Sequence, residues 1–402
     1  MKHIKIFLLC LFLAAGFRST ALTLSPGAEI SILTCSPGDE LYSLFGHTAI
    51  RLQDSSQNID VVFNYGTFDF RTEHFYLKYA QGLLPYQLAT SSYGGFINSY
   101  IEDGRSVWSQ TLQLSQKDKQ RLTDLLLENL EPVNRTYLYN FLFDNCSTRV
   151  RDMIGKSSLT PVTWQNRATG KNFWNLLDEY LYRMPWVKWG IHTILGQPGN
   201  REATSYEYMF LPDYLLQGIE TASLNGKLLS APVETLYQAP VQTNNNRWYF
   251  SPLLVFSIST ILIIWLLQRC TSEKALRLIA IPLFLTTGLI GCLLVFLGFF
   301  TEHPITAPNY NLIWANPLNL VVIPFLFRKR MPVLVGKYLS VYTIILAIGI
   351  LLWFFLLPAV PIASFPLLIL MLFISLKLKI NSDTNCLFTN LLNRFKRSGG
   401  KS

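Results

Sequence analysis

Apolar stretches long enough to cross a bilayer occupy the C-terminal part of the chain and limit what it can fold into. A transmembrane helix needs about 20 largely apolar residues, and such runs recur from Trp248 onward. We expect five spans, the third and fifth of them short, at residues 251–267, 278–300, 312–327, 339–357 and 365–378. Half of the 402 residues are hydrophobic and the mean hydropathy is positive, so we expect a soluble part joined to a membrane part.

Lys and Arg residues give the expected orientation of the spans. They gather after the first, third and fifth spans, where cytoplasmic loops carry such an excess: Arg269, Lys274, Arg277, Arg328, Lys329, Arg330, Lys337, Lys377, Lys379, Arg394, Lys396 and Arg397. An odd number of spans then leaves the residues before Trp248 outside the inner membrane. These loops also account for much of the net charge of +9. No nucleic-acid motif accompanies that charge, so we expect no nucleic-acid partner.

The N-terminus has the pattern of a secretory signal peptide. A short basic segment is followed by apolar residues 6–17 and small residues 19–21, the order of n-region, h-region and cleavage site. An uncleaved anchor is the alternative, because Arg18 is atypical beside a cleavage site. A lipoprotein signal at Cys10 is disfavoured by the large Leu9 before it. The signal peptide and the odd number of spans independently place the next domain in the periplasm.

Four regions are expected along the chain. They are a signal peptide at 1–21, a periplasmic α+β domain at 22–246 ending in a polar linker at 238–246, an all-α transmembrane domain of about five helices at 247–380, and a basic cytoplasmic tail at 381–402. Alternating patterns predict strands at 29–34, 48–52, 60–65, 82–88 and 105–112, the second and third forming a hairpin. Helical spacing predicts helices at 117–130, capped by Ser115, at 147–154 and at 171–182.

Cys146 and His47 are the candidate reactive pair of the periplasmic domain. A thiol needs a neighbouring base to ionise at neutral pH, and Cys146 lies among polar residues at the expected start of a helix, whose dipole favours a thiolate. His47 stands at the head of a predicted strand, with His74 and His192 as alternatives for the base. Cys35 has the apolar neighbours of a packed residue. A disulfide between the two exported cysteines is the structural alternative.

Three motifs in combination resemble the periplasmic domain of the Lnb family of lipoprotein N-acyltransferases. They are SPGDELYSLFGHTAIR at 36–51, NYGTFDF at 64–70 and DNCSTR at 144–149. The order of His before Cys also resembles the permuted papain-like fold of the NlpC/P60 and lecithin:retinol acyltransferase groups. The resemblance extends over nearly the whole chain. It implies an α+β, permuted papain-like periplasmic domain followed by an all-α transmembrane domain.

The resemblance implies a cysteine acyltransferase at the inner membrane, with Cys146 as nucleophile and His47 as base. An acyl chain would pass from a membrane phospholipid to Cys146 as a thioester. It would then pass to the N-terminal amine of an apolipoprotein whose N-terminal Cys is already lipidated. We expect Asn64 rather than Asp69 to orient the imidazole, because Asn64 lies on the neighbouring strand.

Further polar residues are expected to contact substrate or lipid. They lie near the motifs and in the polar loop 301–317 between the second and third spans: Asp69, Asn145, Arg149, His303, Asn309 and Asn311. An interfacial loop anchored by Trp and Tyr is the alternative for loop 301–317. The sequence carries no metal-ligand cluster and no phosphate-binding Gly loop, so we expect no cofactor.

Two other functions stay open on these residues. A cell-wall amidase or peptidase of the NlpC/P60 type would use the same Cys and His, but it needs no large membrane domain. A non-enzymatic membrane assembly protein would instead hold Cys35 and Cys146 as a disulfide.

Overall fold

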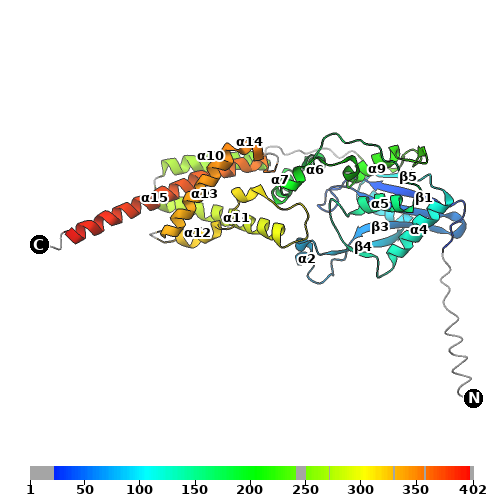
Figure 1. Ribbon diagram of the computed structural model, residues 1–402, viewed down its shortest axis with the longest axis horizontal. Coiled ribbons are helices and arrows are strands. Elements are labelled where there is room, and N and C mark those ends of the chain that lie inside the picture. Colours follow the sequence, from blue (N-terminus) through cyan, green and yellow to red (C-terminus); the bar gives the residue numbers. More distant parts are fainter. Residues whose placement is uncertain (1–21, 241–249, 271, 329–330, 357–358, 399–402) are drawn as a thin grey trace, which may run out of the picture.

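The computed structural model describes residues 22–240, 250–270, 272–328, 331–356 and 359–398, with side chains up to residue 381. The predicted signal peptide and most of the predicted linker lie outside these residues. The chain forms a mixed α/β domain and a helical bundle, joined end to end (Figure 1). The predicted α+β domain followed by an all-α membrane domain is therefore confirmed, whereas the permuted papain-like relation stays a prediction.

A seven-stranded antiparallel sheet forms the centre of the periplasmic domain. Its strands lie in the order β6 (Thr136–Leu138), β4 (Pro85–Ser92), β3 (Ile59–Thr67), β2 (His47–Asp54), β1 (Glu29–Cys35), β5 (Val107–Thr111) and β9 (Glu234–Tyr237). The predicted hairpin is β2 and β3, joined by η1 (Ser55–Gln57) and by Asn58 in the left-handed conformation. The register of β3 against β4 shifts between Asn64 and Thr67, close to the residues of the reactive pair.

Alternating side chains of β1 separate two apolar layers. Ile30 and Ile32 face α4 (Gln116–Leu130) and α5 (Cys146–Ser157) in the larger core. Leu33 and Cys35 belong to a smaller cluster that includes Phe96 of α3 (Tyr93–Glu102). Successive strand residues point to opposite faces of a sheet, so these two clusters lie on opposite sides of β1. Helices therefore cover both faces of the sheet.

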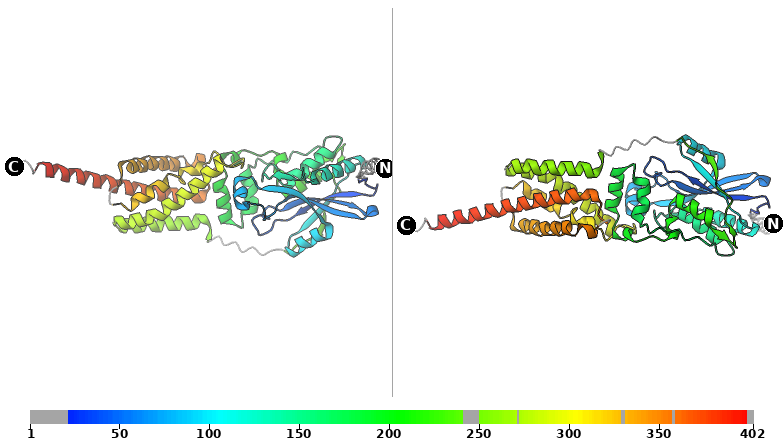
Figure 2. Two further views of the ribbon diagram at one scale, coloured as in Figure 1. Left: turned by 90° about the horizontal axis from the view of Figure 1, so that it is seen from below. Right: turned by 90° about the horizontal axis from the view of Figure 1, so that it is seen from above.

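Smaller elements complete the periplasmic domain. A third cluster lies among helices that follow α5, and α2 stands apart at the edge of the domain: α2 (Phe75–Gln81), α6 (Phe173–Leu181), α7 (Pro185–Ile194), η2 (Gln197–Asn200), α8 (Ser205–Tyr208), α9 (Pro212–Thr221) and the hairpin β7 (Ser223–Leu224) with β8 (Lys227–Leu228). The helices α2, α3, α7, α8 and α9 were not predicted. In three views α2 and α7 lie between the sheet and the helical bundle (Figures 1 and 2).

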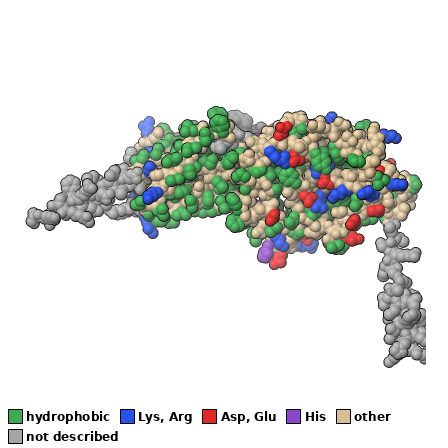
Figure 3. Space-filling view, in the orientation of Figure 1, with side chains coloured by type: hydrophobic (Ala, Val, Ile, Leu, Met, Phe, Trp, Pro, Cys, Tyr) green, Lys and Arg blue, Asp and Glu red, His purple; other side chains and the backbone are tan. Residues whose placement is uncertain are grey.

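Four helices of the described residues are long and apolar enough to cross a membrane. They are α10 (Pro252–Arg269), α11 (Glu273–Phe299), α13 (Val333–Leu351) and α15 (Phe365–Ser398), with α14 (Trp353–Leu356) and η5 (Ile362–Ser364) between the last two. Hydrophobic side chains cover the bundle, and Lys and Arg gather at its end farthest from the periplasmic domain (Figure 3). This distribution agrees with the predicted orientation.

The third predicted span is not a membrane-length helix. Residues 312–327 contain the end of η4 (Tyr310–Ile313) and the eight-residue helix α12 (Asn319–Leu326), which is only about 12 Å long. The segment nevertheless crosses the bundle beside α11. At one end the Thr306 hydroxyl donates to the Leu297 carbonyl at 2.8 Å, and at the other the Arg277 guanidinium donates to the Arg328 carbonyl. Within the described residues, the third predicted span is therefore a discontinuous segment that runs beside α11 among four helices of membrane length.

Polar side chains stabilise the discontinuous segment inside the bundle. The buried Asn319 amide donates to the Thr287 hydroxyl at 2.8 Å, and its oxygen accepts from the Tyr338 hydroxyl at 2.6 Å. Tyr342 donates to the Trp314 carbonyl at 2.6 Å. Irregular backbone is tolerated at membrane depth only where it is buried in protein. These hydrogen bonds with α11 and α13 show that the discontinuous segment is buried in this way.

We predict that Gly291→Ala displaces the discontinuous segment. A Cβ at Gly291 would lie 2.4 Å from the Ala315 carbonyl oxygen and 2.6 Å from the Pro317 nitrogen. Both are backbone atoms, so the overpacking should cost about 1–3 kcal/mol. The expected result is a several-fold lower yield of monodisperse protein in detergent. Gly190→Ala is the control, because its Cβ would meet nothing within 4 Å; equal yields of the two variants would contradict the prediction.

Candidate active site

Cys146 is the first residue of α5, and Asn145 is its N-cap. The Asn145 side-chain oxygen accepts from the amides of Ser147 and Thr148, both at 2.9 Å, and the Thr148 hydroxyl accepts from the Asn145 amide at 2.7 Å. This reciprocal capping box satisfies donors that a helix start otherwise leaves unpaired. The sequence DNCST therefore fixes both the start of α5 and the position of the thiol.

Asn145 holds the start of α5 in place. Its side-chain NH₂ donates to the carbonyls of Phe141 and Phe210, both at 2.8 Å, and only 3 % of the residue is exposed. Together with the two bonds accepted by its oxygen, these contacts use all four hydrogen-bonding positions of the Asn145 side chain within the protein. A contact between Asn145 and substrate stays a prediction.

His47 begins β2 and reaches the Cys146 thiol. A hydrogen bond joins the two side chains, although they are 99 residues apart in sequence. The imidazole Nε2 of His47 lies 3.4 Å from the side-chain oxygen of Asn64 on β3. The amide of Asn64 donates in turn to the Ser91 hydroxyl at 3.3 Å. In the tautomer in which Nε2 donates to this oxygen, Nδ1 carries no proton and can accept one.

Opposing effects set the pKa of the Cys146 thiol. Burial alone raises this pKa and is the largest single effect. The positive charge of the His47 imidazolium and its hydrogen bond act the other way, as do hydrogen bonds from the Thr48 amide and the Ser147 hydroxyl. Together they bring the pKa of Cys146 below the usual cysteine value, which is the direction that a nucleophile requires.

Thr48 also contacts the Cys146 thiol, and it was not predicted as a site residue. Besides its amide bond to the sulfur, its side-chain oxygen lies 3.0 Å from the Ser147 hydroxyl, and both residues are buried. This contact fastens β2 to the first turn of α5. The sequence carried one signal for this role of Thr48, which is its position directly after His47. Successive strand residues point to opposite faces of the sheet, so the residue after a histidine at the start of a strand faces the helix packed on the other side.

Cys35 is chemically unlike Cys146. It pairs with His47 across the β1–β2 register, and it is fully buried. Burial raises the pKa of the Cys35 thiol to about 12, against smaller opposing effects of Arg105 and of a hydrogen bond with Tyr100. Both Cys35 and Cys146 are free thiols in the structure. The disulfide between them, which was the structural alternative, is not formed.

Asp69 and Arg149 do not meet the reactive pair in the way that was expected. Asp69 lies in an exposed segment and pairs with Arg71 at 2.9 Å, so Asn64 rather than Asp69 contacts His47. Arg149 pairs with Asp144 through two bonds of 2.6 and 2.8 Å, and its guanidinium lies 3.4 Å from the centre of the Tyr137 ring. Arg149 therefore braces the loop that precedes Cys146.

Loop 301–317 joins the two domains, and the three residues that were predicted to contact substrate bond to protein groups. The Asn309 amide donates to the carbonyls of Thr193 and Ile194 at the end of α7, both at 2.9 Å. Asn311 is fully buried, donates to the Thr193 carbonyl and accepts from the Trp314 indole. His303 lies 3.2 Å from the Ala80 carbonyl of α2. These side chains are engaged with protein, so the loop serves as a docking surface between domains.

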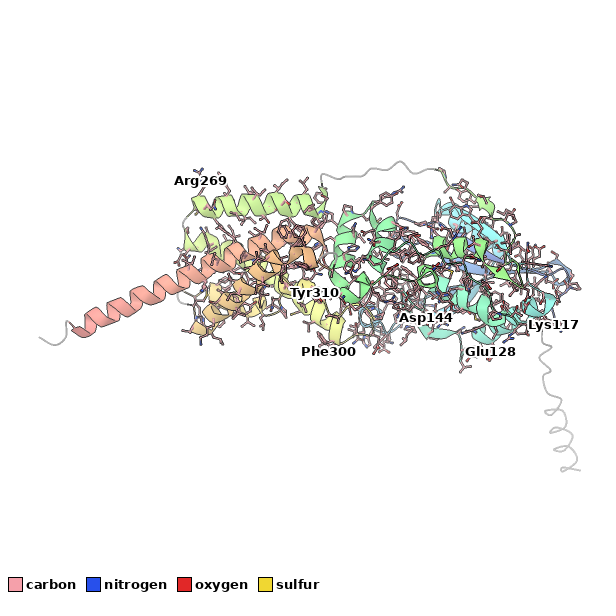
Figure 4. The ribbon with its side chains drawn as sticks, turned by 45° about the horizontal axis from the view of Figure 1, so that its top comes forward. Lys117, Glu128, Asp144, Arg269, Phe300 and Tyr310 are labelled. Atoms are coloured by element: carbon pink, nitrogen blue, oxygen red, sulfur yellow. The ribbon has the colours of Figure 1, made fainter. Side chains whose placement is uncertain are left out.

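The reactive pair lies on the side of the periplasmic domain that is nearer to the bundle. Asp144, two residues before Cys146, is closer to Phe300 at the end of α11 than are Glu128 and Lys117 (Figure 4). Within the described residues no group of three or more His, Cys, Asp or Glu side chains could hold a metal ion. The arrangement is a thiol, a base and an amide that orients the base, the set used in nucleophilic acyl chemistry.

We predict that alkylation of Cys146 by iodoacetamide persists at pH values where an ordinary cysteine is protonated. A lowered pKa means that the thiolate fraction falls only as the pH drops below that lowered value. In His47→Gln the positive partner is lost, so labelling at neutral pH should fall several-fold and recover as the pH rises. Cys35 should stay unlabelled throughout, which serves as the internal control. Identical pH profiles for the two proteins would contradict the assignment of His47.

Comparison with known protein families identifies two matches that together include more than two thirds of the chain. Residues 24–170 match the model of the Lnb N-terminal periplasmic domain, and residues 243–382 match the model of the Lnb transmembrane domain. Cys146, His47 and Asn64 all lie in the first of these ranges. No curated protein and no solved structure matches the chain.

Proposed function

Because the chain belongs to the Lnb family, we propose that it is a membrane-bound lipoprotein N-acyltransferase with Cys146 as nucleophile. One observation carries this proposal: a thiol of lowered pKa, hydrogen-bonded to His47 at the start of a helix, in a domain docked onto a membrane bundle. An acyl donor and an acceptor that are both held in the bilayer suit such a placement.

The first half-reaction forms a thioester. His47 takes the Cys146 proton, and the thiolate attacks an ester carbonyl of a phospholipid. The tetrahedral intermediate collapses with cleavage of the ester C–O bond. The imidazolium returns the proton to the departing alkoxide, which leaves as a lysophospholipid. We assign the Cys146 amide as an oxyanion donor, because the Asn145 cap already takes the amides of Ser147 and Thr148.

The second half-reaction transfers the acyl chain to an amine. The N-terminal amine of a lipidated-Cys apolipoprotein attacks the thioester carbonyl, and His47 accepts a proton from it. Cleavage of the C–S bond releases the amide product and restores the pair of Cys146 and His47. The bilayer holds donor, acceptor and enzyme together, which raises the effective concentration of both substrates. The inner membrane is the compartment that this reaction and the predicted orientation require.

Trapping the acyl-enzyme tests the proposal. Purified full-length protein incubated with phospholipid and no acceptor should carry one acyl chain on the peptide that contains Cys146, detected by mass spectrometry and removed by neutral hydroxylamine. Addition of a lipidated peptide with a free N-terminus should discharge it. A protein that never acquires the acyl mass, but cleaves peptidoglycan fragments, would instead be an amidase of the NlpC/P60 type.

A further inference from the structure

An aromatic patch on and before α2 lies exposed at the surface. We define it by Phe68, Phe70, Phe75, Tyr76 and Tyr79. Phe70 is 69 % exposed and Tyr76 81 % exposed, and none of the seven residues of α2 is buried. A contiguous apolar surface of this kind on a protein marks a site of interaction.

The position of α2 identifies the partner as lipid. Its last residues bond to the end of the second span: the Gln81 carbonyl accepts from the Glu302 amide at 3.0 Å, and the Ala80 carbonyl lies 3.2 Å from His303 Nε2. The span itself ends at Phe299, which is 71 % exposed. The aromatic patch is thus held at the level where a membrane-spanning helix leaves the bilayer (Figures 1 and 2). Phe and Tyr on a short helix at this level suit the outer leaflet.

A row of aromatic rings leads from this patch into the domain. Phe70 contacts Phe68 with 5.0 Å between ring centres, Phe68 contacts Tyr86 at 5.3 Å, and Tyr86 stacks on Tyr139 at 4.4 Å. Phe70 also lies 5.0 Å from Phe75, the first residue of α2. Rings at such separations are in direct contact, so the row is continuous from α2 to Tyr139.

The row ends beside the thiol. An added Cβ at Gly66 would lie 3.5 Å from the Tyr139 ring and 3.7 Å from the Cys146 Cβ, so the ring and the cysteine flank the same point of the backbone. Gly66 has a φ of +88°, a conformation that favours glycine, and it leaves this point without a side chain. The row of rings therefore extends from the aromatic patch to the point of the backbone, at Gly66, that Cys146 also flanks.

We propose that the aromatic patch inserts into the outer leaflet and that the aromatic row guides the acyl chain of the donor phospholipid to Cys146. This inference rests on the proposed function and adds the route by which the donor enters. The donor's acyl chain leaves one apolar environment and moves along another, so its ester carbonyl reaches the thiolate without exposure of the chain to water.

Membrane insertion is tested first, without reference to activity. Phe70→Cys or Leu159→Cys is made in a full-length background in which Cys146 and the exposed Cys270 and Cys292 are replaced by Ser. The variant is labelled with the fluorophore NBD and reconstituted in phosphatidylethanolamine–phosphatidylglycerol nanodiscs. Lipids with a doxyl quencher should quench the label at 70 and leave the label at 159 bright. Leu159 is 60 % exposed but lies beside Asp118, near Lys117 at the far end of the domain (Figure 4). Equal quenching at both positions would overturn the insertion.

The route is tested with two acyl donors. The readout is the rate of Cys146 acylation from phospholipid in nanodiscs divided by the rate from water-soluble p-nitrophenyl acetate. Phe70→Ser should lower this ratio at least about 5-fold, whereas Leu159→Ser should leave it at the value of the unmodified protein. An unchanged ratio in Phe70→Ser overturns the route. If the unmodified protein is acylated by neither donor, the proposed function fails, and the quenching result still decides whether α2 lies in the leaflet.

Discussion

Replacing Cys146 by Ala is expected to lower N-acylation of lipoproteins by about 1,000-fold or more. Removal of the nucleophile eliminates the thioester, and loss of a nucleophile typically costs several orders of magnitude in rate. The side chain is buried and small, so the variant should fold. Mass spectrometry of lipoprotein N-termini, from cells in which this chain is the only source of the activity, should show free α-amines in place of acylated ones.

Cys35→Ala is the matched control for this experiment. It removes a second buried thiol that stands opposite His47 in the sheet register, but one whose pKa is raised by burial. Acylation should persist in Cys35→Ala at the level allowed by the amount of folded protein. Fully acylated N-termini in Cys146→Ala would exclude the transferase mechanism, whatever the result for Cys35→Ala.

Replacing His47 by Ala is expected to lower the rate of transfer by about 100-fold or more, the range typical of a general base. The pKa of Cys146 should rise toward its usual value, because the positive partner and its hydrogen bond disappear. The residual rate should therefore increase with pH as the thiol ionises, whereas the unmodified protein should already be active at neutral pH. The pH dependence of acyl-enzyme formation measures this difference.

His74→Asn controls for the loss of a histidine elsewhere, because Asn tolerates the left-handed backbone conformation, with φ of 56°, that His74 adopts before α2. His74 is an exposed residue whose Nε2 lies 3.4 Å from Glu73, and it has no described contact with Cys146. Its replacement should change neither the rate nor its pH dependence. A His47→Ala variant with the rate and pH profile of the unmodified protein would remove His47 from the mechanism.

The elements and contacts that were predicted well are those marked by residues close together in the sequence. Ser115 caps α4 as expected, and DNC marks the start of α5. The polar turn between two alternating runs gave the β2–β3 hairpin. Once that hairpin was assigned, Asn64 followed as the neighbour of His47. Each of these depends on residues close in sequence, or on one pair of adjacent strands.

The features that were predicted poorly depend on contacts with residues far away in the sequence. Asn309 and Asn311 were taken for substrate contacts because amides suit that role, but the Thr193 carbonyl, more than 100 residues away, occupies them. The third span was expected to be helical because its composition is apolar. The helix is interrupted at residues 314–318, which include Pro317. Asn319, the first residue of α12, then bonds to Thr287 and Tyr338 of other helices. The helix α2 is too short for its periodicity to be recognised.

The docking of loop 301–317 fixes the height of the reactive pair above the bilayer. The amides of Gly196 and Gln197 donate to the carbonyls of Ile305 and Pro308 at 2.6 and 2.8 Å, and a side chain at Gly196 would collide with this loop. The periplasmic domain is therefore held at a fixed distance from the helical bundle. Under the proposed function, a fixed distance from the lipid surface would admit an amine at the anchored end of a lipoprotein and exclude a lysine farther along the same protein.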